Sequence, residues 1–172
     1  MDQVLWLDQA EQAAWRSLVI VSNRVRGILD AELVAAHGLP FADYEVFVQL
    51  SEAPERRLRM SELAERLHIS PSGLTRRLDR LVADGSVSRQ QCPSDRRGSF
   101  AVLEDKGMAR LRDAAPTHVR GVRRHFLERL TVGQQHALTD ALAGIMADDP
   151  NPSHFDDRAA LVSTGSSGAG SR

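Results

Sequence analysis

The sequence predicts a mainly α-helical fold with one small β-hairpin, and three observations indicate it. Apolar residues recur at three- and four-residue spacing over several stretches, helix-capping patterns stand at the ends of these stretches, and two short extended segments flank a turn-forming run. A chain of 172 residues is long enough for one domain with its own core. We expect that domain over residues 1–147 and a flexible tail, rich in serine and glycine, over residues 148–172.

The longest predicted helix starts after Asp8 and runs to about His37. Asp8 and Glu11 have the spacing of a capping box, and Gly38 is a typical helix stop. A helix of this length exposes more apolar surface than one small domain can bury, so part of its apolar seam should meet another subunit. The residues of this seam are Leu18, Val21, Val25 and Ile28.

A second helix and a short strand are expected next. The helix contains Tyr44, Phe47 and Val48 and ends before Pro54, and the strand contains Leu58.

The stretch that begins at Ser61 has the pattern of a helix-turn-helix. A short helix over residues 61–67 is followed by Ser70, whose hydroxyl can cap a helix, and by Pro71, which suits the first helical position. The helix that they open ends near Gly85 and has one leucine face and one polar face. Two short helices joined by a tight turn, the second lined with hydroxyls and arginines, indicate a DNA-binding unit. The leucines are Leu74, Leu78 and Leu81, and the polar residues are Ser72, Thr75, Arg76, Asp79 and Arg80.

A basic hairpin is predicted directly after this unit. Residues 87–90 and 100–103 look extended, and the run from Cys92 to Gly98 between them is typical of a turn and carries Arg96 and Arg97. Such a hairpin is a wing that can place arginine in a narrow minor groove. The alternative for this run, taken alone, is an ordinary solvated loop.

Two more helices are expected after the hairpin. The first is long and contains Pro116, which should kink it. Thr131 and Gln134 form a second capping box that opens the final helix. The apolar residues of the first are Met108, Leu111, Ala115, Val119, Val122, Phe126 and Leu130, and the inward residues of the second are Leu138, Ala141, Leu142 and Ile145.

Charge is distributed unevenly along the chain. The net charge of −1 and the isoelectric point of about 6.6 do not by themselves suggest nucleic acid. Residues 56–97, however, hold ten arginines against five acids, whereas residues 1–55 hold three arginines against nine acids. The positive charge therefore lies on the helix-turn-helix and the wing, as DNA binding requires. The high total of arginines has two explanations: fork-shaped contacts to phosphate and guanine, or a GC-rich genome that favours arginine codons, and we prefer the second for the total.

Five local features are distinctive in this order of elements: Leu63-Ala64, Ser70-x-Ser72-x-Leu74-Thr75-Arg76, Asp79-Arg80-Leu81, the Asp95-Arg96-Arg97 wing and the junction from Leu103 to Gly107. With these features, the chain resembles the MarR family of bacterial regulators over roughly Leu7 to Met146. It departs from the family's common pattern at Glu104, where a threonine cap is usual; glutamate is a poorer cap, although its charge suits a helix N-terminus.

The resemblance implies a homodimer that binds double-stranded DNA at a pseudo-palindromic operator. The dimer would be joined through residues 8–37 and 105–147, and a winged helix-turn-helix over residues 56–103 would bind the DNA. Ser72, Thr75 and Arg76 would enter the major groove, and Arg97, oriented by Asp95, the minor groove. The full set of residues expected at the DNA is Ser70, Ser72, Gly73, Thr75, Arg76, Arg77, Arg80, Asp95, Arg96 and Arg97.

The resemblance also implies a small aromatic or anionic effector, bound in a cleft between the dimer helices and the DNA-binding unit. Trp15 and Arg16, together with Tyr44 and Phe47, are candidates to line that cleft. The alternative is that these aromatic residues, at helical spacing, belong to the core.

Other candidate chemistry is weaker. The thiolate of Cys92 would be favoured by the neighbouring arginines, but thiol sensors of this family usually carry the cysteine in the first helix. His118 and His125 are seven residues apart, about 10 Å along a helix, so we expect structural or solvent-facing histidines and no metal or other cofactor.

The sequence has no Gly-rich phosphate loop, H-E-x-x-H, paired cysteines or G-x-S-x-G, which argues against an enzyme. The sequence has neither a signal-peptide pattern nor an apolar run of membrane-spanning length, so we expect a cytoplasmic protein.

The sequence therefore predicts a sequence-specific DNA-binding transcriptional regulator, most simply an effector-responsive repressor. One alternative is an architectural or accessory DNA-binding protein that responds to no effector. Another is an adaptor that has lost DNA binding, against which the presence of Arg76 and Arg97 argues.

Overall fold

The computed structural model describes residues 4–92 and 95–146. At residues 92, 95–97 and 146 it describes the backbone but not the side chain. The predicted tail over residues 148–172 lies outside the described residues. The chain divides into two compact units, residues 1–129, which carry every element from α1 to η2, and residues 130–172, which carry α6. In chain order the elements are α1 (Gln9–His37), α2 (Phe41–Glu52), the short 3-10 helix η1 (Pro54–Arg56), β1 (Arg57–Arg59), α3 (Met60–Arg66), α4 (Pro71–Ala83), β2 (Val87–Cys92), β3 (Asp95–Leu103), α5 (Asp105–His125), the 3-10 helix η2 (Leu127–Arg129) and α6 (Val132–Met146).

Helix α1 begins and ends where the capping residues predict. The Asp8 carboxylate accepts hydrogen bonds from the backbone N–H groups of Ala10 at 2.7 Å and Glu11 at 2.9 Å, and the Glu11 carboxylate accepts one from the Asp8 N–H at 2.8 Å. Gly38 ends the helix with φ of 59°, in the left-handed region that glycine adopts without strain. The predicted capping box and stop are confirmed.

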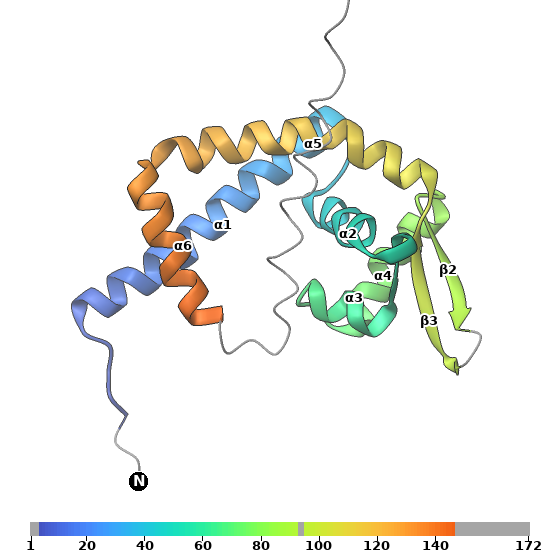
Figure 1. Ribbon diagram of the computed structural model, residues 1–172, viewed down its shortest axis with the longest axis horizontal. Coiled ribbons are helices and arrows are strands. Elements are labelled where there is room, and N and C mark those ends of the chain that lie inside the picture. The colour runs from blue at the N-terminus through green and yellow to red at the C-terminus, as the bar shows by residue number, and fades with distance from the viewer. Residues whose placement is uncertain (1–3, 93–94, 147–172) are drawn as a thin grey trace, which may run out of the picture. The chain divides into compact units, whose positions relative to one another are not determined.

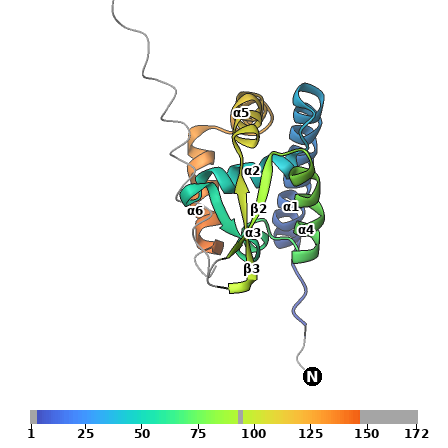
Figure 2. The same ribbon diagram turned by 90° about the vertical axis from the view of Figure 1, so that its right-hand side faces the viewer.

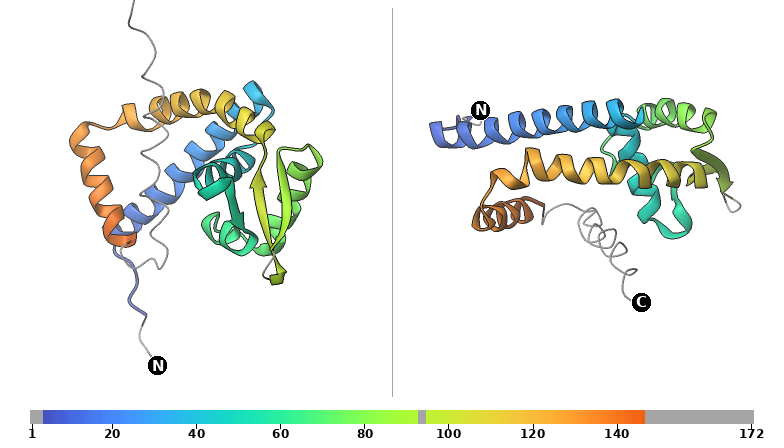
Figure 3. Two further views of the ribbon diagram at one scale, coloured as in Figure 1. Left: turned by 45° about the vertical axis from the view of Figure 1, so that its right-hand side comes forward. Right: turned by 90° about the horizontal axis from the view of Figure 1, so that it is seen from above.

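The core of the first unit lies where α2 meets the helix-turn-helix and the sheet. Helix α2 lies between α5 and the pair formed by α3 and α4 (Figure 1). Helices α1 and α5 pack side by side along much of their length (Figure 3). The largest fully buried side chains of this core are Phe47, Leu33, Leu39, Leu50, Leu63, Leu74, Leu78 and Leu81, with Val46 and Val87.

A three-stranded antiparallel sheet has the order β1-β3-β2. The predicted strand at Leu58 is confirmed as β1, with Leu58 opposite Ala101. The hairpin of β2 and β3 runs beside α3 and extends past it (Figure 2).

The prediction that the whole run from Cys92 to Gly98 forms the turn was wrong. Cys92 still belongs to β2, and β3 already starts at Asp95, with an irregularity in the register between Gln91 and Cys92. Backbone pairing with the facing strand extends both strands through residues that favour turns when isolated, because ladder hydrogen bonds depend little on side-chain type.

Helix α5 differs from the expectation at its C-terminal end. It continues as one helix through Pro116, but it stops at His125 because Phe126 adopts φ of −131° and ψ of −67°, outside the helical region. Phe126 and Leu130 therefore do not continue its apolar face. At its start Glu104 is the N-cap and makes no side-chain capping hydrogen bond, as expected for a poorer cap.

The second unit confirms the predicted capping box before α6. The Thr131 N–H donates to Gln134 Oε1 at 2.9 Å, and the Gln134 N–H donates to Thr131 Oγ1 at 3.3 Å. Leu138 and Leu142 are half-buried, whereas Ile145, expected to face inward, is 71% exposed. Among the described residues, no helix is both long and apolar enough to cross a membrane.

We predict that Gly107→Ala lowers the free energy of unfolding by about 1–3 kcal/mol, because overpacking costs this much. A Cβ at Gly107 would lie 2.6 Å from Leu103 Cδ1 and closer still to the Ser86 carbonyl oxygen, so α5 would have to move away from Ser86, the residue before β2. Gly27→Ala is the matched control: no atom lies within 4 Å of a Cβ there, and the change should stabilise the helix by about 0.5–1 kcal/mol. Equal unfolding midpoints for the two variants would contradict the close approach of α5.

Candidate nucleic-acid interface

Helix α4 is fixed in the fold by its first residue and its leucine face. The Ser70 hydroxyl caps it by accepting a hydrogen bond from the Gly73 N–H at 3.1 Å. Leu74 and Leu78 are fully buried, and Leu81 is 2% exposed. The predicted cap and leucine face are confirmed, and together they determine which side of α4 faces solvent.

The opposite side of α4 is polar and exposed, as predicted. Arg76 makes no ion pair or hydrogen bond with any described residue, so its guanidinium is available to a ligand. The Thr75 hydroxyl donates to the Pro71 carbonyl at 2.9 Å, and the Ser72 hydroxyl lies 3.2 Å from that of Ser70. Both hydroxyls keep acceptor capacity for a donor outside the chain.

Asp79 lies on the same exposed face, where a carboxylate would repel phosphate. Arg89 of β2 compensates for it: its Nη2 lies 2.9 Å from Asp79 Oδ1 and also donates to the Thr75 carbonyl at 3.0 Å. Arg89 thus ties the hairpin to α4 and neutralises the acid. The spacing from 79 to 89 in the sequence does not reveal a contact between a helix and a strand, so this role of Arg89 was not predicted.

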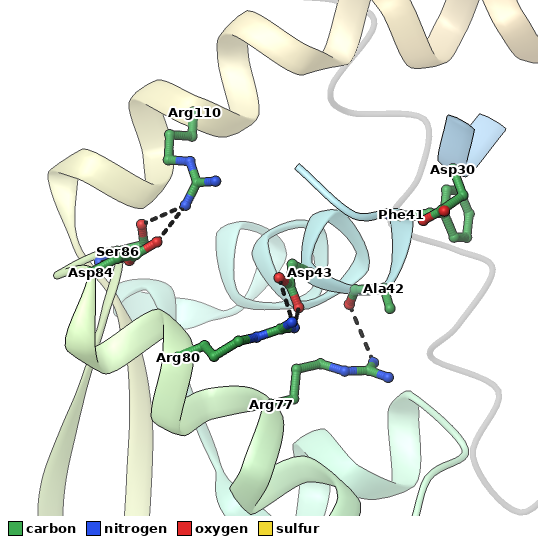
Figure 4. Close-up of polar contacts among 9 residues, drawn as sticks. All are labelled: Asp30, Phe41, Ala42, Asp43, Arg77, Arg80, Asp84, Ser86 and Arg110. Carbon is green, nitrogen blue, oxygen red and sulfur yellow. Dashed lines mark hydrogen bonds and ion pairs between the residues drawn. The ribbon is translucent and has the colours of Figure 1, made fainter. Parts of the chain in front are cut away.

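The side chains of two arginines expected at the DNA point toward α2 and form hydrogen bonds with it (Figure 4). Arg80 Nη2 donates to both carboxylate oxygens of Asp43, at 2.9 and 3.1 Å, and Arg77 Nη1 donates to the Ala42 carbonyl at 3.3 Å. Burial raises the pKa of Asp43 more than the charges of Arg80, Arg77 and Arg110 lower it, so the pKa of this carboxyl lies above its usual value. No local pattern in the sequence distinguishes Asp43, a residue of α2, as a partner of these arginines.

The C-terminal end of α4 is joined to α5 through Asp84 (Figure 4). Arg110 Nη1 donates to Asp84 Oδ2 at 2.7 Å and to the Ser86 hydroxyl at 3.1 Å, and the Ser86 N–H donates to Asp84 Oδ1 at 2.8 Å. Partial burial raises the pKa of Asp84, but hydrogen bonds from Ser86 and the charges of Arg110 and Lys106 together lower it below its usual value.

The hairpin carries the remaining residues predicted at the DNA. Asp95, Arg96 and Arg97 belong to β3, and their side chains lie outside the described residues, as does that of Cys92. On the same sheet, the guanidinium carbons of Arg57 and Arg59 each lie 5.3 Å from the centre of the Phe100 ring. Arg57 is also paired with Glu55, with 3.0 Å between Nη2 and Oε2.

The four candidate effector contacts do not gather in one place within the described chain. Trp15 is 61% exposed and Arg16 is exposed, both in the first third of α1. Tyr44 and Phe47 are buried in the core, and the nearby ion pair between α1 and α2 is formed by Arg26, about 16 Å further along α1 than Trp15.

A separate hollow of about 460 Å³ lies between α1 and α5 and contains none of these four residues. It is lined by Glu32, Ala35, Ala36, Thr117, Arg120 and Arg124.

The histidines considered as metal ligands make structural contacts. His125 Nε2 lies 2.9 Å from Glu32 Oε1, and the His118 ring packs against Tyr44 with 4.7 Å between ring centres. Over residues 4–92 and 95–146, no three His, Cys, Asp or Glu side chains form a group that could hold a metal ion.

Comparison with known proteins agrees with this geometry. Residues 37–98 match the model of the MarR family. A MarR family transcriptional regulator from Streptomyces coelicolor, Sco3205, solved in complex with DNA, is 41% identical, with 83% of this chain and 89% of that chain covered and a TM-score of 0.77. AbsC, another MarR family regulator from Streptomyces coelicolor, is 39% identical, with 84% and 97% covered and a TM-score of 0.76. The HTH-type transcriptional repressor YetL of Bacillus subtilis is 30% identical over 112 residues, which are 65% of this chain and 66% of YetL.

We predict that Asp84→Asn destabilises the protein at neutral pH and not in acid. An acid whose pKa is lowered by folding contributes stability above its usual pKa, and this contribution disappears as the pH falls through the folded value. Because Asp84 is partly exposed, we expect a loss of about 0.2–1 kcal/mol, as measured by urea unfolding at several pH values. Asp113→Asn, an exposed acid on α5, is the control and should change nothing. A loss from Asp84→Asn that is equal at neutral and acid pH would contradict this account.

Proposed function

Because the chain belongs to the MarR family of transcriptional regulators, we propose that it is an effector-responsive repressor that binds double-stranded DNA as a homodimer in the cytoplasm. The observation that carries the proposal is the exposed polar face of α4, held opposite three buried leucines. Two relatives support its finer parts: Sco3205 was solved with DNA, and YetL is described as a repressor. As a member of a family of regulators, the chain is not an enzyme.

On DNA, α4 would lie in the major groove. Ser72, Thr75 and Arg76 are the exposed side chains that can meet base edges, with Arg76 suited to a guanine. The wing would place Arg97 in the minor groove, oriented by Asp95. We assign the phosphate contacts to the remaining predicted residues: Ser70, Gly73, Arg77, Arg80 and Arg96.

The apolar surface of α1 supports a dimer. Five large apolar side chains in its N-terminal half are between 37% and 63% exposed, which is unusual for a helix that faces only water. A second copy of the chain, with residues 105–147 also taking part, would cover them and would bring two α4 helices onto one pseudo-palindromic operator. These side chains are Trp15, Leu18, Val19, Ile20 and Val21.

An effector bound between the dimer helices and the DNA-binding unit would change the spacing of the two α4 helices. Trp15 offers stacking area and an indole N–H on α1. The Arg110 contacts with Asp84 and Ser86 join α5 to the end of α4, so a shift of α5 would reach the helix that binds DNA. A coupling of about 1–3 kcal/mol between effector and operator gives 5- to 150-fold release.

We predict that Arg76→Ala and Arg97→Ala weaken DNA binding in different ways. Arg76→Ala should cost about 1–3 kcal/mol and relax the base preference at one position in each half-site. Arg97→Ala should reduce affinity and the salt dependence while keeping that preference. The measurement is a titration of each variant, at several salt concentrations, with the duplex that the wild type selects from random DNA. Unchanged affinity in both variants would mean that α4 and the wing do not dock as proposed.

We predict that the protein sediments as a dimer at micromolar concentration, because the exposed apolar face of α1 needs a partner. Analytical ultracentrifugation of the full chain checks this. A monomer that still binds the selected duplex specifically would disprove the proposed assembly.

We predict that a small aromatic or anionic metabolite both stabilises the dimer and releases the operator. The measurement is a thermal-shift screen followed by DNA titration with each hit, repeated with Trp15→Ala. Release that survives Trp15→Ala would remove Trp15 from the site, and the absence of any hit would favour the effector-independent architectural protein.

A further inference from the structure

Asp43 is a buried carboxylate whose partner lies on another helix and at the surface. Asp43 is 4% exposed, whereas the Arg80 side chain is 65% exposed. A single nitrogen of Arg80, Nη2, makes both hydrogen bonds to Asp43, and its Nε and Nη1 donate to no described residue (Figure 4). The guanidinium is therefore held from one side while its other donors face solvent.

Arg80 stands where a DNA-binding helix needs a phosphate contact. It follows Arg76 by one helical turn, about 6 Å toward the C-terminal end of α4, and lies on the α2 side of the exposed face. Its neighbour Arg77 is already held by the Ala42 carbonyl at 3.3 Å. Arg77 is half-buried and Arg80 is exposed, so Arg80 offers more of its remaining donors to a ligand.

The energetics of Asp43 favour a role other than stability. Because the pKa of Asp43 is raised in the folded chain, the stability that it contributes is largest below the usual pKa of an aspartate and is lost as the pH rises through the folded value. The groups that face it are Arg80 and Arg77 of α4 and Arg110 of α5, and their charges do not outweigh the cost of burial. A buried carboxyl whose charged partners do not repay its desolvation contributes little to stability, and such groups are enriched at functional sites.

We propose that Asp43 is a positioning residue for DNA binding, which holds Arg80 so that the free edge of its guanidinium meets a DNA phosphate. This rests on the proposed function of α4. Asp43 itself does not touch DNA; it acts by removing the conformational freedom of a long side chain before DNA arrives, so that less entropy is lost on binding. The Arg77 contact joins α2 and α4 independently, so the helices stay together when Asp43 is changed.

The experiment compares Asp43→Asn, Arg80→Ala and the double variant in the full chain. Each is titrated against the duplex selected by the wild type, at several salt concentrations, and its unfolding midpoint is measured at neutral pH. Asp30→Asn is the matched control, because Asp30 accepts a hydrogen bond from the Phe41 N–H at 2.8 Å and joins α1 to α2 without touching α4.

Arg80→Ala should bind about tenfold more weakly for each protomer bound, as loss of one charge-assisted contact implies, and its slope of log affinity against log salt should fall by about 0.9 for each protomer. Asp43→Asn, which keeps the Arg80 charge but not its ordering, should bind about two- to tenfold more weakly for each protomer, with a salt slope close to that of the wild type. The double variant should be no weaker than Arg80→Ala, and Asp30→Asn should match the wild type. Asp43→Asn should keep or raise the unfolding midpoint, whereas Arg80→Ala, which leaves a buried charge unpaired, should lower it.

Wild-type affinity in Asp43→Asn would overturn the inference, and so would losses from Asp43→Asn and Arg80→Ala that add up in the double variant. Arg76→Ala separates this inference from the proposed function, because Arg76 lies outside the ion pair. Undiminished base preference in Arg76→Ala contradicts the docking of α4, whereas an unchanged Asp43→Asn contradicts the role of Asp43 alone.

Discussion

The burial of three leucines of α4 is the constraint on which the DNA-binding surface depends. Leu74, Leu78 and Leu81 enter a core built by α2, α3 and the sheet, and each has a burial worth about 1.5–3 kcal/mol. Because an α-helix has 3.6 residues per turn, the burial of these three positions determines which residues lie on the opposite, exposed side. Rotating α4 to hide Arg76 would expose the leucines, so the fold itself presents the polar face.

Polar contacts then hold α4 at three places. Ser70 caps its first turn, Ala42 and Asp43 of α2 hold Arg77 in its middle and Arg80 in its last turn, and Arg110 of α5 contacts Asp84, which follows that turn. These contacts contribute less free energy than the burial of the leucines. They orient α4, whereas the leucines hold it in the core. They also connect α4 to the helices that the proposed dimer uses, which is the physical route from an effector to DNA.

Sequence reasoning found the elements whose signals are local. The capping boxes at Asp8 and Thr131, the start of α4 at Ser70 and its leucine face all follow from short-range rules, and the structure confirms them. The extent of β2 and β3 and the end of α5 at His125 were missed, since pairing with a neighbouring strand and a local change of φ and ψ leave no periodic signal. Asp43 and Arg89 were missed for the same reason: their partners are 37 and 10 residues away in the chain, and only the fold brings them together.

In the proposed complex, two α4 helices, one from each protomer, bind successive major grooves on one face of a duplex. Hydroxyl-radical footprinting of the full chain on its selected duplex tests this arrangement. We expect two protected segments whose centres are about 10–10.5 base pairs apart, related by the pseudo-palindrome of the site. Even protection along the duplex, with no preferred register, would contradict it.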